Sequence, residues 1–214
     1  LCNYVENNYS SEPSFEIKNS NGKHTIHAAS FWIGGVDQDN KFHLSAPTFM
    51  LQGFDIFQGP MMYAQYYNEQ EDAKWNRVWK VNKETVDKHR LHFSDEGYEI
   101  PEVIENWPAH GDISKGQSPN LAPFVDVNAD GEYNPEKGDY PSIKGDQAIL
   151  FIYNDARAQH ASGAQQMGVE VVGMAYAFNR PSDETYDNMV FTEYTIINRS
   201  GWDYKDVKIG VWTD

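Results

Sequence analysis

Alternation of hydrophobic and polar residues is clearest in the last third of the chain. Between Val190 and Ile197, successive side chains would point to opposite faces of an extended strand. Runs rich in β-branched and aromatic residues, as strands are, span 147–154, 168–179, 189–198 and 205–214. The last three are separated by short polar turns, which predicts an antiparallel sheet.

The N-terminal half begins with a polar stretch, 1–13, that has no periodicity and predicts an extended lead-in. Strand-like runs follow at 15–18 and 23–35, the second closed by two glycines. Turn-forming residues at 37–40 precede a further strand-like run at 42–46. The sequence therefore predicts a hairpin over 23–46.

The middle of the chain changes character. Residues 52–67 are rich in Gly, Met and aromatics without a period, and predict an irregular packed loop. Three- and four-residue spacing of apolar positions predicts a helix over 72–93. A short helix starts near Pro101 and ends before Pro108. From 109 to 146 Gly, Pro, Asp and Asn dominate, and a loop of this length is usually functional or ordered by an ion.

Together these patterns predict a mainly β fold with antiparallel, sandwich-like sheets, one inserted helix and a long calcium-type loop. We expect a single β-rich domain over 14–214, with 52–146 as its insertion. Because the sequence stops just after a strand-like run, we also expect the protein to continue beyond 214.

Net charge and cysteine content exclude some classes of binding partner and metal site. The 214 residues carry a formal net charge of -15, from 32 acidic and 17 basic residues. Such a surface repels phosphate backbones and anionic lipids, so nucleic acid and direct membrane insertion are not expected. Carboxylates also attract divalent cations. Cys2 is the only cysteine, which excludes an intrachain disulfide and a cysteine-based metal site.

The strongest chemical motif is the acidic stretch 126–139. Asp126, Asn128 and Asp130 occupy loop positions one, three and five, and Gly131 stands at six, as in an EF-hand-type calcium loop. The carbonyl of Glu132 would supply position seven. The alternative is a surface turn in which Asp and Asn cap their own backbone, but three ligands and a glycine at the right spacing favour calcium.

The closing ligand is less regular. An EF-hand has Glu at position twelve, where this chain has Lys137, and no helical pattern flanks the loop. Asp139 is the preferred closing carboxylate because Gly138 lets the chain fold back, and Glu136 is the second choice. Asp146 could complete this site or anchor another, but we prefer a solvated turn for it.

The sequence signals for catalytic groups are weaker than the signal for the calcium loop. His89 and His92 could share a helix face, but a metal needs a third ligand, and we interpret both as helix-surface histidines. Glu170 and Glu193 lie on predicted strands and would be the paired carboxylates of a glycosidase, although strand glutamates usually face solvent or pair with Lys or Arg. No catalytic residue is assigned.

Several blocks together carry a family resemblance: GKHTIHAASFWIGGVD, FDIFQGP, WNRVWKV, IENWPAHG, LAPFVDVNADGEYNPEKGDYPSIKGDQ and YTIINRS. In this order they resemble the N-terminal region of large secreted Bacteroidota proteins of the type 9 secretion class, which carry a C-terminal sorting domain. The resemblance runs from Gly22 onwards. It implies export across the outer membrane and an extracellular or cell-surface location, with further β-sandwich modules in the same long chain.

We therefore expect a structural or adhesive module, stabilised by calcium, of a secreted or cell-surface protein. Its partners would be other modules of the same chain or an outer-membrane or cell-surface assembly. The alternative is a secreted carbohydrate-active domain that binds or hydrolyses glycans, for which the six Trp and 13 Tyr could provide stacking platforms.

Overall fold

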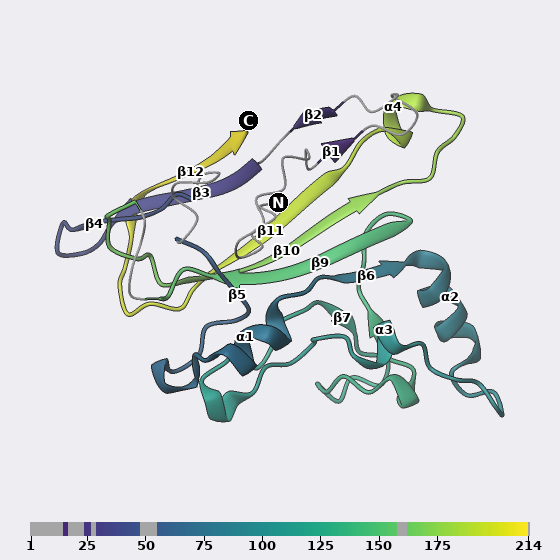
Figure 1. Ribbon diagram of the computed structural model, residues 1–214. Helices are drawn as coiled ribbons and strands as arrows, with labels where there is room; N and C mark the ends of the chain where they lie inside the picture. The colour runs from purple at the N-terminus through teal and green to yellow at the C-terminus, as the bar shows by residue number, and fades with distance from the viewer. Residues whose placement is uncertain (1–14, 17–23, 27–28, 48–54, 158–161, 214) are drawn as a thin grey trace. The chain divides into compact units, whose positions relative to one another are not determined.

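The computed structural model describes residues 15–16, 24–26, 29–47, 55–157 and 162–213 (Figure 1). The chain divides into two compact units with interleaved segments: 1–57, 154–170 and 197–214 form the first, and 58–153 and 171–196 the second. The predicted lead-in, 1–13, lies outside the described residues. The single-domain boundary stays a prediction.

The first unit contains a three-stranded antiparallel sheet. Its order is β12-β3-β4, formed by β3 (Ala29–Val36), β4 (Phe42–Ser45) and β12 (Lys205–Thr213). Strands β3 and β4 form the hairpin that the sequence predicts. Two short strands, β1 (Phe15–Glu16) and β2 (His24–Ile26), form a second antiparallel pair.

A five-stranded sheet lies mostly in the second unit. Its order is β11-β10-β9-β5, and β6 pairs with β9. The strands are β5 (Phe57–Gln58), β6 (Trp79–Asn82), β9 (Gln147–Asn154), β10 (Val169–Ala177) and β11 (Phe191–Asn198). The four predicted C-terminal strands are thus confirmed. The sequence analysis leaves the strand order open, and in the structure β12 pairs with β3. One detail differs from the predicted short turns, because α4 (Glu184–Asp187) lies between β10 and β11.

The predicted helix over 72–93 is wrong in its middle. The segment forms α1 (Glu69–Trp75), strand β6 and α2 (Lys83–His92). In β6, the buried Trp79 and Val81 alternate with exposed residues. This two-residue period is that of a strand. In the sequence it is obscured by apolar residues on either side of β6 that recur at helical spacing. Pairing of β6 with β9 decides the outcome, since it aligns Trp79 with Leu150 and Val81 with Ala148 in the core.

Short elements make up the rest of the second unit. Helix α3 (Glu102–Glu105) confirms the prediction after Pro101, and α2 packs beside β6 (Figure 1). The predicted 109–146 loop is confirmed as largely irregular. The remaining elements are η1 (Ala64–Tyr66), η2 (Ile113–Lys115), β7 (Phe124–Val125), η3 (Pro135–Lys137) and β8 (Tyr140–Pro141).

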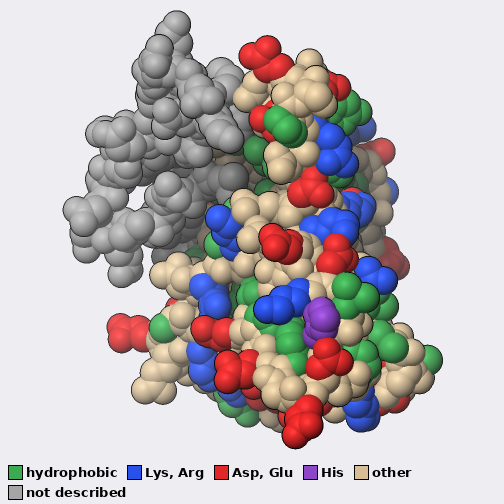
Figure 2. Space-filling model, turned by 90° about the vertical axis from the view of Figure 1, so that its right-hand side faces the viewer, with side chains coloured by type: hydrophobic (Ala, Val, Ile, Leu, Met, Phe, Trp, Pro, Cys, Tyr) green, Lys and Arg blue, Asp and Glu red, His purple; other side chains and the backbone are tan. Residues whose placement is uncertain are grey.

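On the face drawn in Figure 2, acidic and basic side chains are interspersed rather than gathered into patches of one sign. In the described part of the chain, no helix has the length and apolar character needed to cross a membrane.

We predict that Gly173→Ala destabilises the second unit. A Cβ at this position in β10 would lie 2.1 Å from Cε2 of Phe151, a ring that also contacts Tyr153 and Tyr194. The forced shift should cost about 1–3 kcal/mol, measured as a lower urea midpoint. Gly201→Ala, where an added methyl meets nothing within 4 Å, is the control. Equal midpoints for the two variants would contradict this account.

Candidate metal centre

Three aspartates of the predicted loop lie together. Asp126, Asp130 and Asp139 each offer one carboxylate oxygen, and these oxygens all lie within 4.8 Å of one another. Among the described residues, no other group of three His, Cys, Asp or Glu side chains is arranged in this way. The three range from buried at Asp139 to exposed at Asp130.

Pairing of two short strands brings the ends of the loop together. In β7 and β8, Val125 lies opposite Tyr140 and Phe124 lies opposite Pro141. Asp126 directly follows β7 and Asp139 directly precedes β8. The antiparallel pair therefore places the first and last carboxylates of the motif side by side, although they are 13 positions apart.

Asp126 holds the turn of the motif. Its carboxylate accepts hydrogen bonds from the backbone N–H of Gly131 at 2.7 Å and of Asp130 at 3.3 Å. Ala129 and Gly131 both have positive φ, at 58° and 84°. The left-handed conformation at these two residues folds the chain back over Asp126, and Gly131 adopts it without a steric cost.

Asp130 lies where three donors converge. Its carboxylate accepts from Lys137 Nζ at 2.8 Å, from the N–H of Glu132 at 3.0 Å and from the Asn128 amide at 2.8 Å. These bonds, the Lys137 ammonium first, lower the pKa of Asp130 to about 2. The carboxylate therefore stays ionised well into the acid range. Lys137 already provides one positive charge at the position that a twelfth-position Glu would take in an EF-hand.

Asp139 is fully buried. One carboxylate oxygen accepts the N–H of Val127 and the other accepts the N–H of Asn134, both at 2.8 Å. Gly138, with φ 98°, turns the chain into β8, and a Cβ at this position would lie 2.9 Å from Cζ of Phe93. Asp139 thus ties the two halves of the loop together through a buried charge.

His89 supports Asp139 from α2, and its predicted surface position is wrong. Its ring is fully buried, and Nε2 lies 3.1 Å from the carbonyl oxygen of Asp139. Burial lowers the pKa of His89, so the ring is neutral and donates Nε2–H to that carbonyl. The spacing of the two histidines along the sequence does not reveal which of them is buried. In the structure His89 is buried, whereas His92, on the same helix, pairs with Asp95 at the surface.

Two further residues position the loop and were not predicted. The N–H of Tyr133 donates to Nε2 of His110 at 3.0 Å, so Nδ1–H of that ring donates to the Pro119 carbonyl at 2.8 Å. The Tyr133 hydroxyl donates to the carbonyl of Ile104 at 2.6 Å. The loop is therefore anchored to α3 and to the 110–119 segment before any ion is considered.

The other predicted ligands have different positions. Asn128 contacts Asp130, and the carboxylate of Glu136 is not part of the three-aspartate cluster. The Glu132 carbonyl as a ligand stays a prediction. The geometry thus favours Asp139 over Glu136 as the closing carboxylate. Asp146 lies apart from the cluster, where it accepts from the N–H of Asn179 and pairs with Arg180 at 3.2 Å.

The two strand glutamates have basic partners. Glu170 is buried and lies 3.2 Å from Arg199, and the exposed Glu193 pairs with Lys144. Each pairing is the ordinary one for a strand glutamate, so neither residue adds to a catalytic assignment.

The cluster is suited to a hard cation. Its three donor atoms are carboxylate oxygens, which is the donor type of calcium or magnesium rather than the nitrogen and sulfur set that zinc often takes. Each oxygen of Asp139 accepts one N–H and so retains a lone pair for an ion. Asp126, Asp130 and Asp139 are the residues that would hold it.

We predict that Asp139→Asn destabilises the second unit even without metal. Asparagine has one acceptor oxygen, so either Val127 or Asn134 loses its partner and faces an NH₂ group in a buried position. The free energy of unfolding in chelator should fall by about 2–4 kcal/mol. Glu136→Gln, at an exposed position of the same loop, is the matched control, and a similar loss in that variant would refute the role of Asp139.

Comparison of this chain with protein-family models, with curated proteins and with solved structures gives no match.

Proposed function

We propose that this chain is a calcium-stabilised structural or adhesive module of a secreted or cell-surface protein, exported by the type 9 system. The observation that carries the proposal is the convergence of Asp126, Asp130 and Asp139 in a loop whose spacing is that of a calcium site. In the same proposal, the antiparallel β fold is sandwich-like. The partners are other modules of the chain or a cell-surface assembly.

Charge supports an ion in this loop. Three carboxylates within 4.8 Å repel one another, and one ammonium, from Lys137, offsets only part of that repulsion. The pKa of Asp130, about 2, shows that protonation does not remove the negative charge near neutral pH. A divalent cation would neutralise the remaining charge, and the flexible coordination of calcium suits a loop that departs from the EF-hand pattern.

The ion would act mechanically rather than catalytically. The 126–139 loop is built mainly from exposed and half-buried polar residues, so it contributes little apolar burial. A cation bridging Asp126, Asp130 and Asp139 would cross-link the loop in the folded state alone, which stabilises that state by mass action.

We predict a calcium-specific rise in melting temperature of the whole chain. With calcium at about one hundred times its dissociation constant, the gain of about 2.7 kcal/mol corresponds to roughly 5–10 °C. Thermal melts in calcium, in magnesium and in chelator measure it. Asp130→Ala should abolish most of the calcium gain and change the melt in chelator little, whereas Glu136→Ala should retain the gain. Equal melts of the native chain in calcium and chelator would end the proposal.

We also predict that Lys137→Met tightens calcium binding. The ammonium, 2.8 Å from Asp130, competes with an ion for the same oxygen and repels it. Its removal should increase affinity about tenfold at low salt, or about 1.4 kcal/mol, as measured by calorimetric titration. Lys144→Met removes an equal charge from the exposed pair with Glu193 and should leave affinity unchanged. Weaker binding after Lys137→Met would show that the lysine supports the site instead.

A further inference from the structure

Among the residues that the structure describes, the three-stranded sheet of the first unit has one edge without a partner strand. This edge is β12, which lies beside β3 and pairs with it (Figure 1). The opposite edge is covered, because Leu44 of β4 donates its N–H to the Gln165 carbonyl at 3.0 Å and His43 forms a bridge with Gln165. The outer side of β12 therefore presents backbone N–H and C=O groups with which another strand could pair.

β12 also exposes a stripe of β-branched side chains. Val207, Ile209 and Val211 are 43%, 60% and 71% exposed, at the two-residue spacing of one strand face. Directly opposite residues of an antiparallel pair share a face of the sheet. Ile209 lies opposite Ile33, and Val211 lies opposite Phe31. Both β3 residues are buried, so the buried apolar face of β3 continues onto β12 and becomes exposed there.

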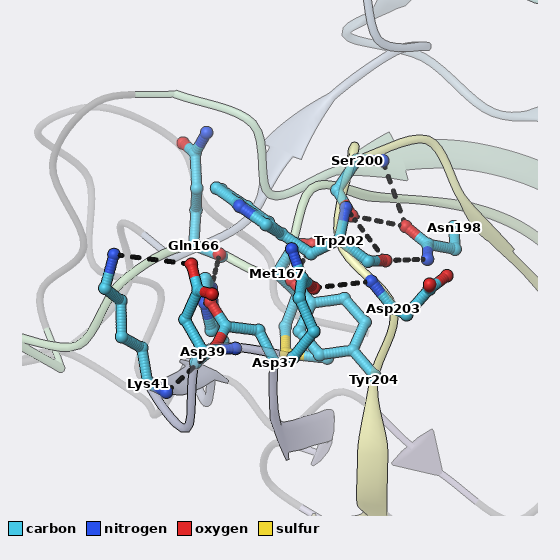
Figure 3. Close-up of polar contacts among 12 residues, drawn as sticks. Asp37, Asp39, Lys41, Gln166, Met167, Asn198, Ser200, Trp202, Asp203 and Tyr204 are labelled. Carbon is cyan, nitrogen blue, oxygen red and sulfur yellow. Dashed lines mark hydrogen bonds and ion pairs between the residues drawn. The ribbon is translucent and has the colours of Figure 1, made fainter.

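The segment that leads into β12 is held by side-chain contacts. Figure 3 shows Trp202, Asp203 and Tyr204 on this segment. The Tyr204 hydroxyl donates to the Met167 carbonyl at 2.6 Å. The N–H of Asp203 donates to Oε1 of Gln38 at 2.9 Å. β12 is therefore positioned before a partner strand arrives, which lowers the entropy cost of pairing.

Charges and a bulge protect only the first part of this edge. Lys205, Asp206 and Lys208 are exposed, and the pairing with β3 shifts register at this point, where Asp206 has φ 54°. Bulges and charged side chains are the usual means by which edge strands avoid pairing with other chains. From Ile209 to Thr213 the strand has no charged residue and keeps a continuous register with β3. This part of the edge is open to strand addition.

We propose that β12 pairs with β12 of a second copy of the chain, as an antiparallel ladder about a two-fold axis at Gly210. Thr213, also exposed, continues the stripe at the same spacing. In this register Ile209 of each copy lies opposite Val211 of the other, and Val207 lies opposite Thr213. All four residues of the stripe are thus paired with one another. Gly210 lies opposite Gly210 on the axis, where no side chain hinders close approach.

Charge and area set the strength of this contact. Each copy has a formal net charge of -15, so two copies repel one another at low ionic strength. Between Val207 and Thr213 the charged residue is Lys208, which this register places opposite Trp212 rather than opposite another lysine. A basic edge on an acidic protein is where two copies meet with least repulsion. A single strand pair lies at the low end of interface area, below about 1,200 Å², so the dimer is weak.

Sedimentation velocity of the whole chain measures this association. From micromolar to near-millimolar concentration, the native chain should convert from monomer to dimer, and more completely at high salt than at low salt. The experiment is run in chelator, so that its result does not depend on the proposed ion. A native chain that stays monomeric over the whole range would overturn the proposal.

Ile209→Lys tests whether β12 forms the contact. It places an ammonium opposite Val211 of the other copy and should weaken the dimer at least about tenfold. Because Ile209 is exposed, the variant should keep its fold, which a thermal melt checks. Leu91→Lys, at a 74% exposed position on α2, makes the same change of net charge and should retain the dimer. Equal weakening in both variants would overturn the assignment to β12.

Disulfide trapping tests the register. In a Cys2→Ser background, Gly210→Cys provides one thiol per chain, opposite its copy at a Cα separation of about 4.5–5.5 Å that a disulfide spans. The sheet accepts this change, since a Cβ at Gly210 meets Trp32 Cβ at 3.9 Å. Gly201→Cys, where an added Cβ meets nothing within 4 Å, is the control. Oxidation should give covalent dimer with Gly210→Cys and not with Gly201→Cys, and equal yields would overturn the pairing.

Discussion

Buried aspartates that accept backbone N–H groups are the constraint on which the long loops of this chain depend. Asp37, Asp55, Asp139 and Asp155 are each at most 1% exposed, and each accepts two backbone N–H groups. Burying a carboxylate is unfavourable unless donors replace its water. Most of the donors here are loop residues, and Val169 is the first residue of β10. Each carboxylate therefore satisfies backbone N–H groups of the loops while those groups stabilise the charge.

The charge that remains on these carboxylates needs a counterion, and two solutions are visible. In the first unit, Asp37 has the His43 ring as its partner, and aromatic side chains seal the pair. In the second unit, Asp139 lies near two further carboxylates, and among the described residues the ammonium paired with this cluster is that of Lys137. The first arrangement is enclosed by the rings of Trp202 and Tyr204. The second is partly exposed and carries more negative than positive groups, which is the imbalance that the proposed cation would offset.

What could be read from the sequence is local in character. The strands from Gln147 onwards were predictable because alternation with a period of two is a property of neighbouring residues. The tight loop from Asp126 to Gly131 was predictable for the same reason, since its spacing lies within six consecutive residues. The partner of β12 was not, since its pairing with β3 joins distant parts of the chain. The break in the predicted 72–93 helix has the same origin, as β6 exists because it pairs with β9. His89 and His110 reach the loop across 50 and 23 positions, and no spacing rule covers such contacts.

The pKa of Asp130, about 2, keeps this carboxylate ionised across the range in which histidines ordinarily titrate. Protonation of Asp130 therefore does not compete with a cation near neutral pH. In the proposal for the loop, a dependence of stability on divalent cation at neutral pH would reflect ion binding rather than a change in the charge of Asp130.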